Sequence, residues 1–366
     1  MIIGLDGRSL EGNLTGVGKY TKNLILGLAK TGFICTVYCT KKPKEIVSKN
    51  NIRIKILKSK SKYVFEQVLL PKELSKNPPD IYHATNNLGI PLLYGGISVL
   101  TLHDIIPITK NNYFKSSRFP VVSKNLFLIN TKIAIHKSTR IITISKTTKQ
   151  NIIKIFGIKK NKIEVIYPGI SVPKKTNPEI INSLNLKKND FILNNGGIDR
   201  RKNLEKLIEA FVFVNKTFPN TKLVITGKNI SYQNTLKKMV KKMGIEKNIV
   251  FTGFVNRENL WALIKASDFV CYPSEEEGFG LPIIEAIELK KAIILSNIPA
   301  FKEIASEFAL FVDHNNPLSI AREIIKLKKD KNLKKSLIEK SSFKRGIFSW
   351  KKTIEKTIGI YKQINK

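Results

Sequence analysis

The stretch FVCYPSEEEGFGLPIIEA, residues 269–286, joins an apolar strand pattern to an acidic, glycine-containing loop and then to an apolar helical pattern. Its glycines and Pro282 exclude one continuous helix from Glu277 to Glu285, because proline belongs in the first turn of a helix. We therefore expect Glu277 in the loop and Glu285 about one turn into the helix. Carboxylates placed in this way face one cleft from different elements, and they can accept hydrogen bonds from the neighbouring hydroxyls of a sugar.

Apolar strand patterns of the same kind alternate with helical patterns along nearly the whole chain. Strands that are apolar throughout, with helices between them, are typical of parallel sheets covered on both faces. We therefore predict an α/β fold of two doubly wound Rossmann-like domains, whose ligands bind beyond the carboxyl ends of the strands. The predicted strands are 2–8, 33–40, 52–57, 80–85, 98–104, 140–145, 163–169, 191–198, 222–228, 249–255, 269–274, 292–297 and 310–313.

The length of 366 residues also favours two domains. Two prolines and a loss of periodicity place the boundary in a linker at 171–190. We predict the N-terminal domain at 1–170, the C-terminal domain at 191–345, and a last helix with an apolar stripe at 346–366.

The chain is strongly basic, with 64 lysines and arginines against 28 acidic residues and a net charge of +36. Such a charge attracts anions, among them nucleic acid, an anionic membrane and a nucleotide. Two interpretations stay open: a functional basic surface, and a general excess of lysine, isoleucine and asparagine spread along the chain.

The remaining composition favours a cytoplasmic protein. No apolar run reaches the length of about 18 residues that a spanning helix needs, and the first residues do not form a signal peptide pattern. The three cysteines, Cys35, Cys39 and Cys271, lie in strand patterns, which is typical of buried thiols in a reducing compartment.

Basic residues follow the predicted strand at 191–198, in the sequence GGIDRRKN. Arg200, Arg201 and Lys202 stand just before a helical pattern that begins near Asn203. Cations stabilise the C-terminus of a helix rather than its N-terminus, so helix stability does not explain them. Fixed cations beside a helix N-terminus instead indicate a site for a diphosphate.

The helix that carries Glu285 offers a second group of donors. The first backbone N–H groups of a helix have no acceptor inside it. Here they belong to Phe279, Gly280 and Leu281, and we expect them to point towards an anion or a sugar oxygen.

Two loops of the N-terminal half also follow predicted strands. Gly16 and Gly18 open a helical pattern, which suits either the close approach of a ligand or a tight strand–helix connection. His103 and Asp104 end a strand, where they either serve a site or pack and cap the turn.

The E-x7-E spacing of Glu277 and Glu285 within EGFGLPIIEA resembles that of the retaining glycosyltransferases of family 4, which have the GT-B architecture. The resemblance runs nearly end to end and implies two Rossmann-like domains with a cleft between them and a C-terminal helix that crosses back to the N-terminal domain. The other matching segments are GVGKYTKNL, TLHDIIP, ITISKTTKQNI, IYPGI, GGIDRRKN and FSWKKTIEKTIGIY.

The resemblance implies roles for individual residues, with Glu277, Lys202 and His103 as the catalytic ones. Lys202, with Arg200 or Arg201, neutralises the donor diphosphate; which arginine does so stays open, because Gly197 stands where many members have an arginine. The other implied contacts are Glu277 and His103 with the donor sugar, Glu285 with the ribose, Phe279, Gly280 and Leu281 with sugar and phosphate, and Gly16, Gly18, His103 and Asp104 on the acceptor side.

The implied reaction moves a hexose, such as mannose or glucose, from a UDP-sugar or GDP-sugar with retention of configuration. The acceptor is a glycan or a lipid-linked glycan in surface polysaccharide or glycoconjugate synthesis, and domain closure excludes water. No DxD metal motif lies in a suitable loop, so we expect no metal and no other cofactor. In the front-face scheme associated with such enzymes, the leaving phosphate takes the proton of the acceptor.

Three alternatives stay open: a nucleotide-sugar epimerase, a basic nucleic-acid-binding protein, and a partner-binding protein on a non-catalytic GT-B scaffold. The best-placed cations accompany carboxylates, which repel a polynucleotide, so we expect no nucleic acid.

The basic charge also suits an enzyme at the inner face of the plasma membrane. Candidate surfaces are Lys58, Lys60 and Lys62 beside Tyr63 and Phe65, and the loop at 110–124, against the alternative of a solvated basic face.

Overall fold

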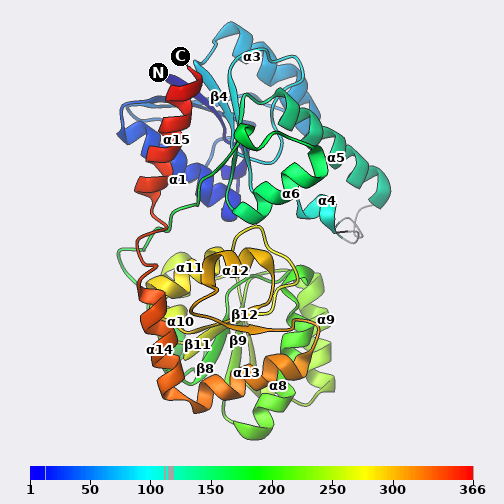
Figure 1. The fold of residues 1–366 in the computed structure, drawn as a ribbon, viewed down its shortest axis with the longest axis vertical. Helices are drawn as coiled ribbons and strands as arrows, with labels where there is room; N and C mark the ends of the chain where they lie inside the picture. The colour runs from blue at the N-terminus through cyan, green and yellow to red at the C-terminus, as the bar shows by residue number, and fades with distance from the viewer. Residues whose placement is uncertain (13, 111–112, 114–118, 366) are drawn as a thin grey trace. The chain divides into compact units, whose positions relative to one another are not determined.

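The structure is a computed structural model that describes residues 1–12, 14–110, 113 and 119–365. The chain divides into two compact units, Met1–Gly169 with Phe348–Lys366, and Ile170–Ile347 (Figure 1). Residues 111, 112 and 114–118 of the loop predicted as a candidate surface at 110–124, Phe114 among them, lie outside the described residues.

Within the described residues, the first unit has one parallel sheet of seven strands in the order β3-β2-β1-β4-β5-β6-β7. The strands of its centre are buried along almost their whole length, because helices cover both faces. Its strands are β1 Ile2–Asp6, β2 Ile34–Cys39, β3 Ile52–Ile56, β4 Ile81–Ala84, β5 Ser98–Leu102, β6 Arg140–Thr143 and β7 Ile163–Val165.

Helices follow most of the strands of this unit, whereas loops alone join β2 to β3 and β4 to β5. The helices are α1 Gly16–Lys30, α2 Lys62–Val64, α3 Leu70–Lys76, α4 Ile106–Thr109, α5 Pro120–Lys137, α6 Lys146–Phe156 and α15 Trp350–Ile364, with the short helical turns η1 Arg8–Leu10, η2 Phe65–Leu69 and η3 Lys160–Lys162. None of the helices in the described parts of the chain is both long and apolar enough to span a bilayer.

The last helix, α15, packs against α1 in the core of the first unit. The Tyr361 hydroxyl lies 2.5 Å from His83 Nδ1, and His83 Nε2 lies 2.7 Å from Thr101 Oγ1. Burial, together with the nearby His103, lowers the pKa of His83 to about 3. His83 is therefore neutral at ordinary pH and joins α15 to the strands β4 and β5.

The second unit has a parallel sheet of six strands in the order β10-β9-β8-β11-β12-β13, within the described residues. Its strands are β8 Phe191–Asn194, β9 Lys222–Thr226, β10 Ile249–Gly253, β11 Phe269–Tyr272, β12 Ile293–Ser296 and β13 Leu310–Val312. Its helices are α7 Glu179–Ser183, α8 Leu204–Thr217, α9 Ile230–Lys242, α10 Arg257–Ala266, α11 Leu281–Glu288, α12 Pro299–Ala305, α13 Pro317–Lys329 and α14 Lys331–Ser342, with the turns η4 Arg200–Lys202 and η5 Glu246–Asn248.

The segment predicted as a linker, 171–190, lies within the second unit, where its helix α7 packs on α10.

The strand order reverses once in each unit. In the second unit the chain runs outward from β8 through β9 to β10 and then returns to place β11 on the other side of β8. The loops after β8 and β11 therefore diverge at the carboxyl edge of the sheet, where doubly wound sheets bind their ligands. In the first unit the same reversal falls between β1 and β4.

Candidate active site

The loop after β8 is held in shape by its own side chains. Asp199 caps the turn η4, because its Oδ1 accepts a hydrogen bond of 3.0 Å from the Arg201 N–H. Asn203 then adopts the left-handed conformation with φ of 56°, and its Nδ2 donates to the Pro273 carbonyl at 3.1 Å. The turn that carries Arg200, Arg201 and Lys202 is thereby fixed to the loop after β11.

Lys202, Arg201 and Glu277 form a cluster that we call the ion triad. The Lys202 ammonium donates to Glu277 Oε1, and Arg201 Nη1 donates to Oε2 at 2.7 Å. Ser274 Oγ also donates to Oε1 at 3.1 Å. The Lys202 and Glu277 side chains are only 8% and 11% exposed, and that of Arg201 is 31% exposed.

The electrostatics of the triad favour an ionised carboxylate. Burial opposes the ionisation of Glu277, but the nearby Lys202 and Arg201 charges outweigh it and hold its pKa below the ordinary value of 4.5. Burial lowers the pKa of Lys202 from 10.5, and Glu277 offsets part of this change. Asp199 Oδ1 also lies 3.6 Å from Arg201 Nε, so two cations and two carboxylates meet at the carboxyl edge of the sheet.

Arg200 lies apart from the triad, although it is adjacent in sequence. Its side chain is 79% exposed and lies over the Tyr232 ring at 5.0 Å, with Glu205 at 3.9 Å. The structure thus brings Arg201, and not Arg200, into contact with Glu277.

Glu285 is buried on α11 and belongs to a second polar group. Asn195 Nδ2, from the loop after β8, donates to Glu285 Oε2 at 3.0 Å. The Tyr272 hydroxyl at the end of β11 donates in turn to Asn195 Oδ1. Asn195 and Tyr272 were not among the predicted site residues. The asparagine pair directly after the apolar run of β8 was the available signal for Asn195, whereas Tyr272 reads as an ordinary strand residue.

Helix α11 begins where the sequence pattern predicts, with Pro282 in its first turn. Gly280 has a φ of 121°, and a Cβ there would lie 2.8 Å from Ile283 Cδ1. Phe279 is buried. The tight turn between β11 and α11 therefore needs a glycine, and it brings the backbone of Phe279, Gly280 and Leu281 to the start of the helix that carries Glu285.

In the first unit, His103 is buried at the carboxyl end of β5. Its Nε2 donates to the Thr85 carbonyl at 3.0 Å, and its ring and that of Tyr20 pack edge to face with centroids 5.0 Å apart. Burial lowers the pKa of His103 to about 4, although the hydrogen bond to Thr85 opposes this change. Because Nε2 carries the proton, neutral His103 offers Nδ1 as an acceptor.

The remaining predicted residues of this unit shape its backbone. Asp104 Oδ1 accepts from the Ile106 N–H at 3.1 Å and so caps the turn before α4. Gly16 begins α1, and Gly18 lies in its first turn. A Cβ on Gly18 would lie 2.5 Å from the Ser9 carbonyl oxygen, so this position requires glycine.

Two family descriptions match the chain and together span most of it. Glycosyl transferases group 1 matches residues 176–342, and Glycosyltransferase Family 4 matches residues 14–173. The two parallel Rossmann-like sheets, with polar groups at their carboxyl edges, agree with these two descriptions. The chain belongs to the glycosyltransferases of family 4.

Individual relatives agree with this family. An uncharacterised glycosyltransferase of Methanocaldococcus jannaschii is 29% identical over 250 residues, and the match covers 63% of this chain and 61% of that protein. The O-antigen chain mannosyltransferase RfbU of Salmonella typhimurium is 26% identical over 337 residues, which cover 87% of this chain and 88% of RfbU. The chain thus spans less than two thirds of the first relative and most of the second.

A solved structure shares the whole fold. HepE of Anabaena, in complex with UDP-glucose, superposes with a TM-score of 0.78 and 17% identity over 99% of both chains. This likeness and the two parallel sheets confirm the predicted α/β fold of two Rossmann-like domains.

Proposed function

We propose that this glycosyltransferase moves a hexose, such as mannose or glucose, from a nucleoside-diphosphate sugar to a glycan or lipid-linked acceptor in surface polysaccharide synthesis, with retention of configuration. The observation that carries the proposal is the ion triad at the carboxyl edge of the second sheet. The O-antigen mannosyltransferase RfbU and the UDP-glucose bound to HepE support this class of acceptor and donor. These relatives give no support to an epimerase or to a nucleic-acid-binding protein.

In this proposal, Lys202 and Arg201 bind the donor diphosphate and stabilise the charge that develops as the nucleoside diphosphate leaves. Their partial burial supports the role, because an electrostatic interaction is stronger where water is excluded. Glu277 keeps both cations in place before the donor binds and then contacts the sugar. The N–H groups at the start of α11 hydrogen-bond to sugar and phosphate oxygens.

Glu285 binds the ribose hydroxyls of the donor. Its contact with Asn195 supports this role, because the amide fixes the orientation of a buried carboxylate, and carboxylates bind ribose hydroxyls in Rossmann-like folds. Tyr272 holds the amide of Asn195 in turn.

His103 positions the donor sugar rather than carrying a proton. Its pKa of about 4 keeps it neutral near pH 7, and a neutral imidazole that already donates from Nε2 accepts a sugar hydroxyl at Nδ1. The acceptor proton passes to the departing phosphate oxygen as the bond between the sugar and that oxygen breaks. Gly16, Gly18 and Asp104 shape the loops on the acceptor side.

We further propose that transfer needs no divalent metal, because two fixed cations already oppose the diphosphate charge. Activity assays with and without EDTA test this point. Equal rates support it, and a loss of activity that added Mg²⁺ or Mn²⁺ restores contradicts it.

A peripheral contact with the inner face of an anionic membrane completes the proposal. Tyr63, Val68 and Leu93 are exposed. The Leu92 N–H donates to Gln67 Oε1 at 2.9 Å and so joins the loop of Leu93 to the turn η2, which follows the basic segment of residues 58–62. The predicted role of Phe65 in this surface was wrong, because its side chain is completely buried in the turn η2.

Co-sedimentation with phosphatidylglycerol vesicles tests the membrane contact. Binding at low salt that Leu93→Glu weakens supports it, and no binding at low or high salt contradicts it.

A thermal-shift panel of UDP, GDP, ADP and their sugars tests the donor class, since a ligand of the native state raises its stability. We expect stabilisation by one nucleoside diphosphate and its sugar, lost in Lys202→Ala and in Glu285→Ala. Lys237→Ala, on the exposed face of α9, is the control of equal charge and should behave like the native chain. Wild-type affinity in both site variants contradicts the proposed donor site.

A further inference from the structure

A second polar hollow lies in the same unit, at the amino edge of its sheet. It is open, has a volume of about 700 Å³, and is lined by residues that precede β8, β9, β11 and β12 and by the facing ends of α13 and α14. The ion triad lies beyond the opposite, carboxyl edge of these strands. Strands of four residues at roughly 3.3 Å each separate the two edges by about 13 Å, so the hollow is a different site.

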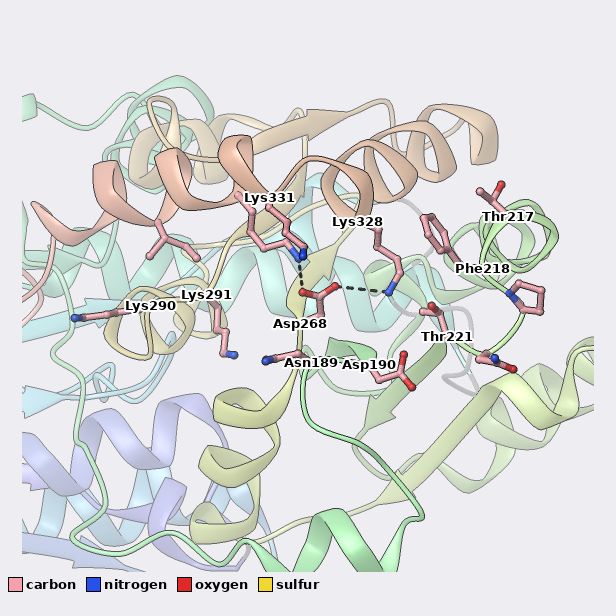
Figure 2. A pocket seen from close by; sticks show the side chains of 14 residues that line it. Asn189, Asp190, Thr217, Phe218, Thr221, Asp268, Lys290, Lys291, Lys328 and Lys331 are labelled. Atoms are coloured by element: carbon pink, nitrogen blue, oxygen red, sulfur yellow. Dashed lines mark hydrogen bonds and ion pairs between the residues drawn. The ribbon is translucent and has the colours of Figure 1, made fainter.

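Lysines dominate this hollow. Its lining includes five of them, Lys290, Lys291, Lys328, Lys331 and Lys334, but only two acidic residues, Asp190 and Asp268. Figure 2 shows the Asp268 carboxylate in the middle of the group, with lysines from α13, α14 and the loop before β12 around it. The lining therefore carries a surplus of three positive charges when all of these groups are ionised.

Asp268 organises two of the lysines. Its Oδ1 accepts from the Lys334 ammonium, and its Oδ2 lies 3.6 Å from Lys328 Nζ. The side chains of Asp268 and Lys328 are each 10% exposed and that of Lys334 is 19% exposed. Packing fixes these ammonium groups further, since Lys328 lies 5.2 Å from the centre of the Phe218 ring. The cations are thus held in place by the fold.

Lys291 adds a third fixed cation. Its Nζ donates to the Ser267 carbonyl at 2.5 Å. Burial lowers its pKa to about 8; Asp268 opposes this change, while Lys188 and Lys334 add to it. Burial is the main reason that the charged form of Lys291 is disfavoured, and a multiply charged anion in the hollow would favour that form.

We propose that the hollow binds a small soluble diphosphate anion, of which inorganic pyrophosphate is the simplest. The charge of about −3 on such a group near neutral pH complements the surplus on the lining, and phosphate oxygens suit the converging ammonium donors. This site is independent of the proposed donor site, so evidence against either site leaves the proposal for the other unchanged.

Chemical labelling tests the place of binding, residue by residue. A limiting amount of an acetylating reagent labels the lysines with and without inorganic pyrophosphate, and peptide mass spectrometry reports the rate at each. We expect pyrophosphate to slow labelling of Lys291 about fivefold or more while exposed Lys237 on α9 changes little. The same protection in Lys202→Ala separates the hollow from the donor site. Equal rates at Lys291 with and without pyrophosphate, or protection that Lys202→Ala removes, overturn the proposal.

Calorimetric titration with pyrophosphate tests the affinity. Lys290 and Lys331 are exposed, so replacing both with glutamine leaves the Asp268 pair intact and preserves the fold. To remove the donor site, all variants also carry Lys202→Ala. We expect the double replacement to weaken binding about tenfold or more, since each lysine at contact distance contributes about fivefold even in water. The matched control, Lys237→Gln with Lys238→Gln, removes the same charge from α9. If both pairs weaken binding equally, only the net charge attracts the anion, and the proposed site is wrong.

Discussion

The two neighbouring arginines of the donor loop provide a sharp prediction, because they differ in placement but not in charge. Arg201 is 31% exposed and donates to Glu277 at 2.7 Å, whereas Arg200 is 79% exposed and lies over Tyr232. We predict that Arg201→Ala strongly reduces sugar transfer and that Arg200→Ala has little effect.

The size of the effect follows from the chemistry of the leaving group. Removing one donor that stabilises charge in a transition state costs about 3–4 kcal/mol in a water-excluded site. Arg201 is about one third exposed, so we discount this to about 2 kcal/mol, which is roughly a thirtyfold loss in kcat/KM. For an exposed side chain such as Arg200, we expect a change of at most about fivefold.

The assay is the initial rate of nucleoside diphosphate release from the donor that the ligand panel identifies, with thermal unfolding of each variant as the control for folding. An Arg200→Ala loss as large as that of Arg201→Ala refutes the reasoning from burial. A fully active Arg201→Ala variant removes this residue from the diphosphate site.

Three further predictions concern stability, each measured by urea unfolding. The pKa of Glu277 is held below 4.5, so its ionised form contributes fully to the free energy of unfolding above about pH 4.5, and this contribution is lost as the pH falls through the folded-state pKa. The difference in stability between the native chain and Glu277→Gln should shrink in that range, and a difference that stays constant contradicts the ion triad. The pKa of His83 is lowered from 6.5 to about 3, so keeping its ring neutral takes nothing from the free energy of unfolding above pH 6.5 but about 2 kcal/mol at pH 5. His83→Gln should therefore lose less stability than the native chain between pH 6.5 and 5, and an equal loss in both proteins contradicts a buried neutral ring. Gly18→Ala should lower the stability by about 1–3 kcal/mol, because its Cβ would collide with the Ser9 carbonyl oxygen. Gly359→Ala, where a Cβ meets no atom within 4 Å, should stabilise α15 by up to about 1 kcal/mol, and equal effects of the two substitutions contradict the close contact at Gly18.

Much of the fold could be predicted from the sequence. All of the predicted strands form, because short apolar segments between helical patterns in an α/β protein are most readily buried in a sheet that is covered on both faces. The order of the strands could not be read in the same way, because it depends on which helices cross which face.

The site was partly predictable for a related reason. Glu277, Glu285 and Lys202 could be predicted because the strand and helix patterns around them do not explain their charges. Whether Arg200 or Arg201 contacts Glu277 depends on the path of the turn η4, and the sequence alone does not determine this path. Phe65 is the converse case: it follows exposed Tyr63 in a basic segment, but the helical turn η2 directs it into the core.

The contact between Lys202 and the donor diphosphate is the central claim, and one comparison tests it most directly. Calorimetry measures the affinity of the native chain and of Lys202→Ala for the preferred nucleoside diphosphate and for the same nucleoside without phosphates. We predict that Lys202→Ala weakens the nucleoside diphosphate about thirtyfold or more, as expected for a buried charge-assisted contact, and changes the nucleoside by less than about twofold. An equal change for both ligands, or none for either, contradicts the claim that this lysine binds the diphosphate.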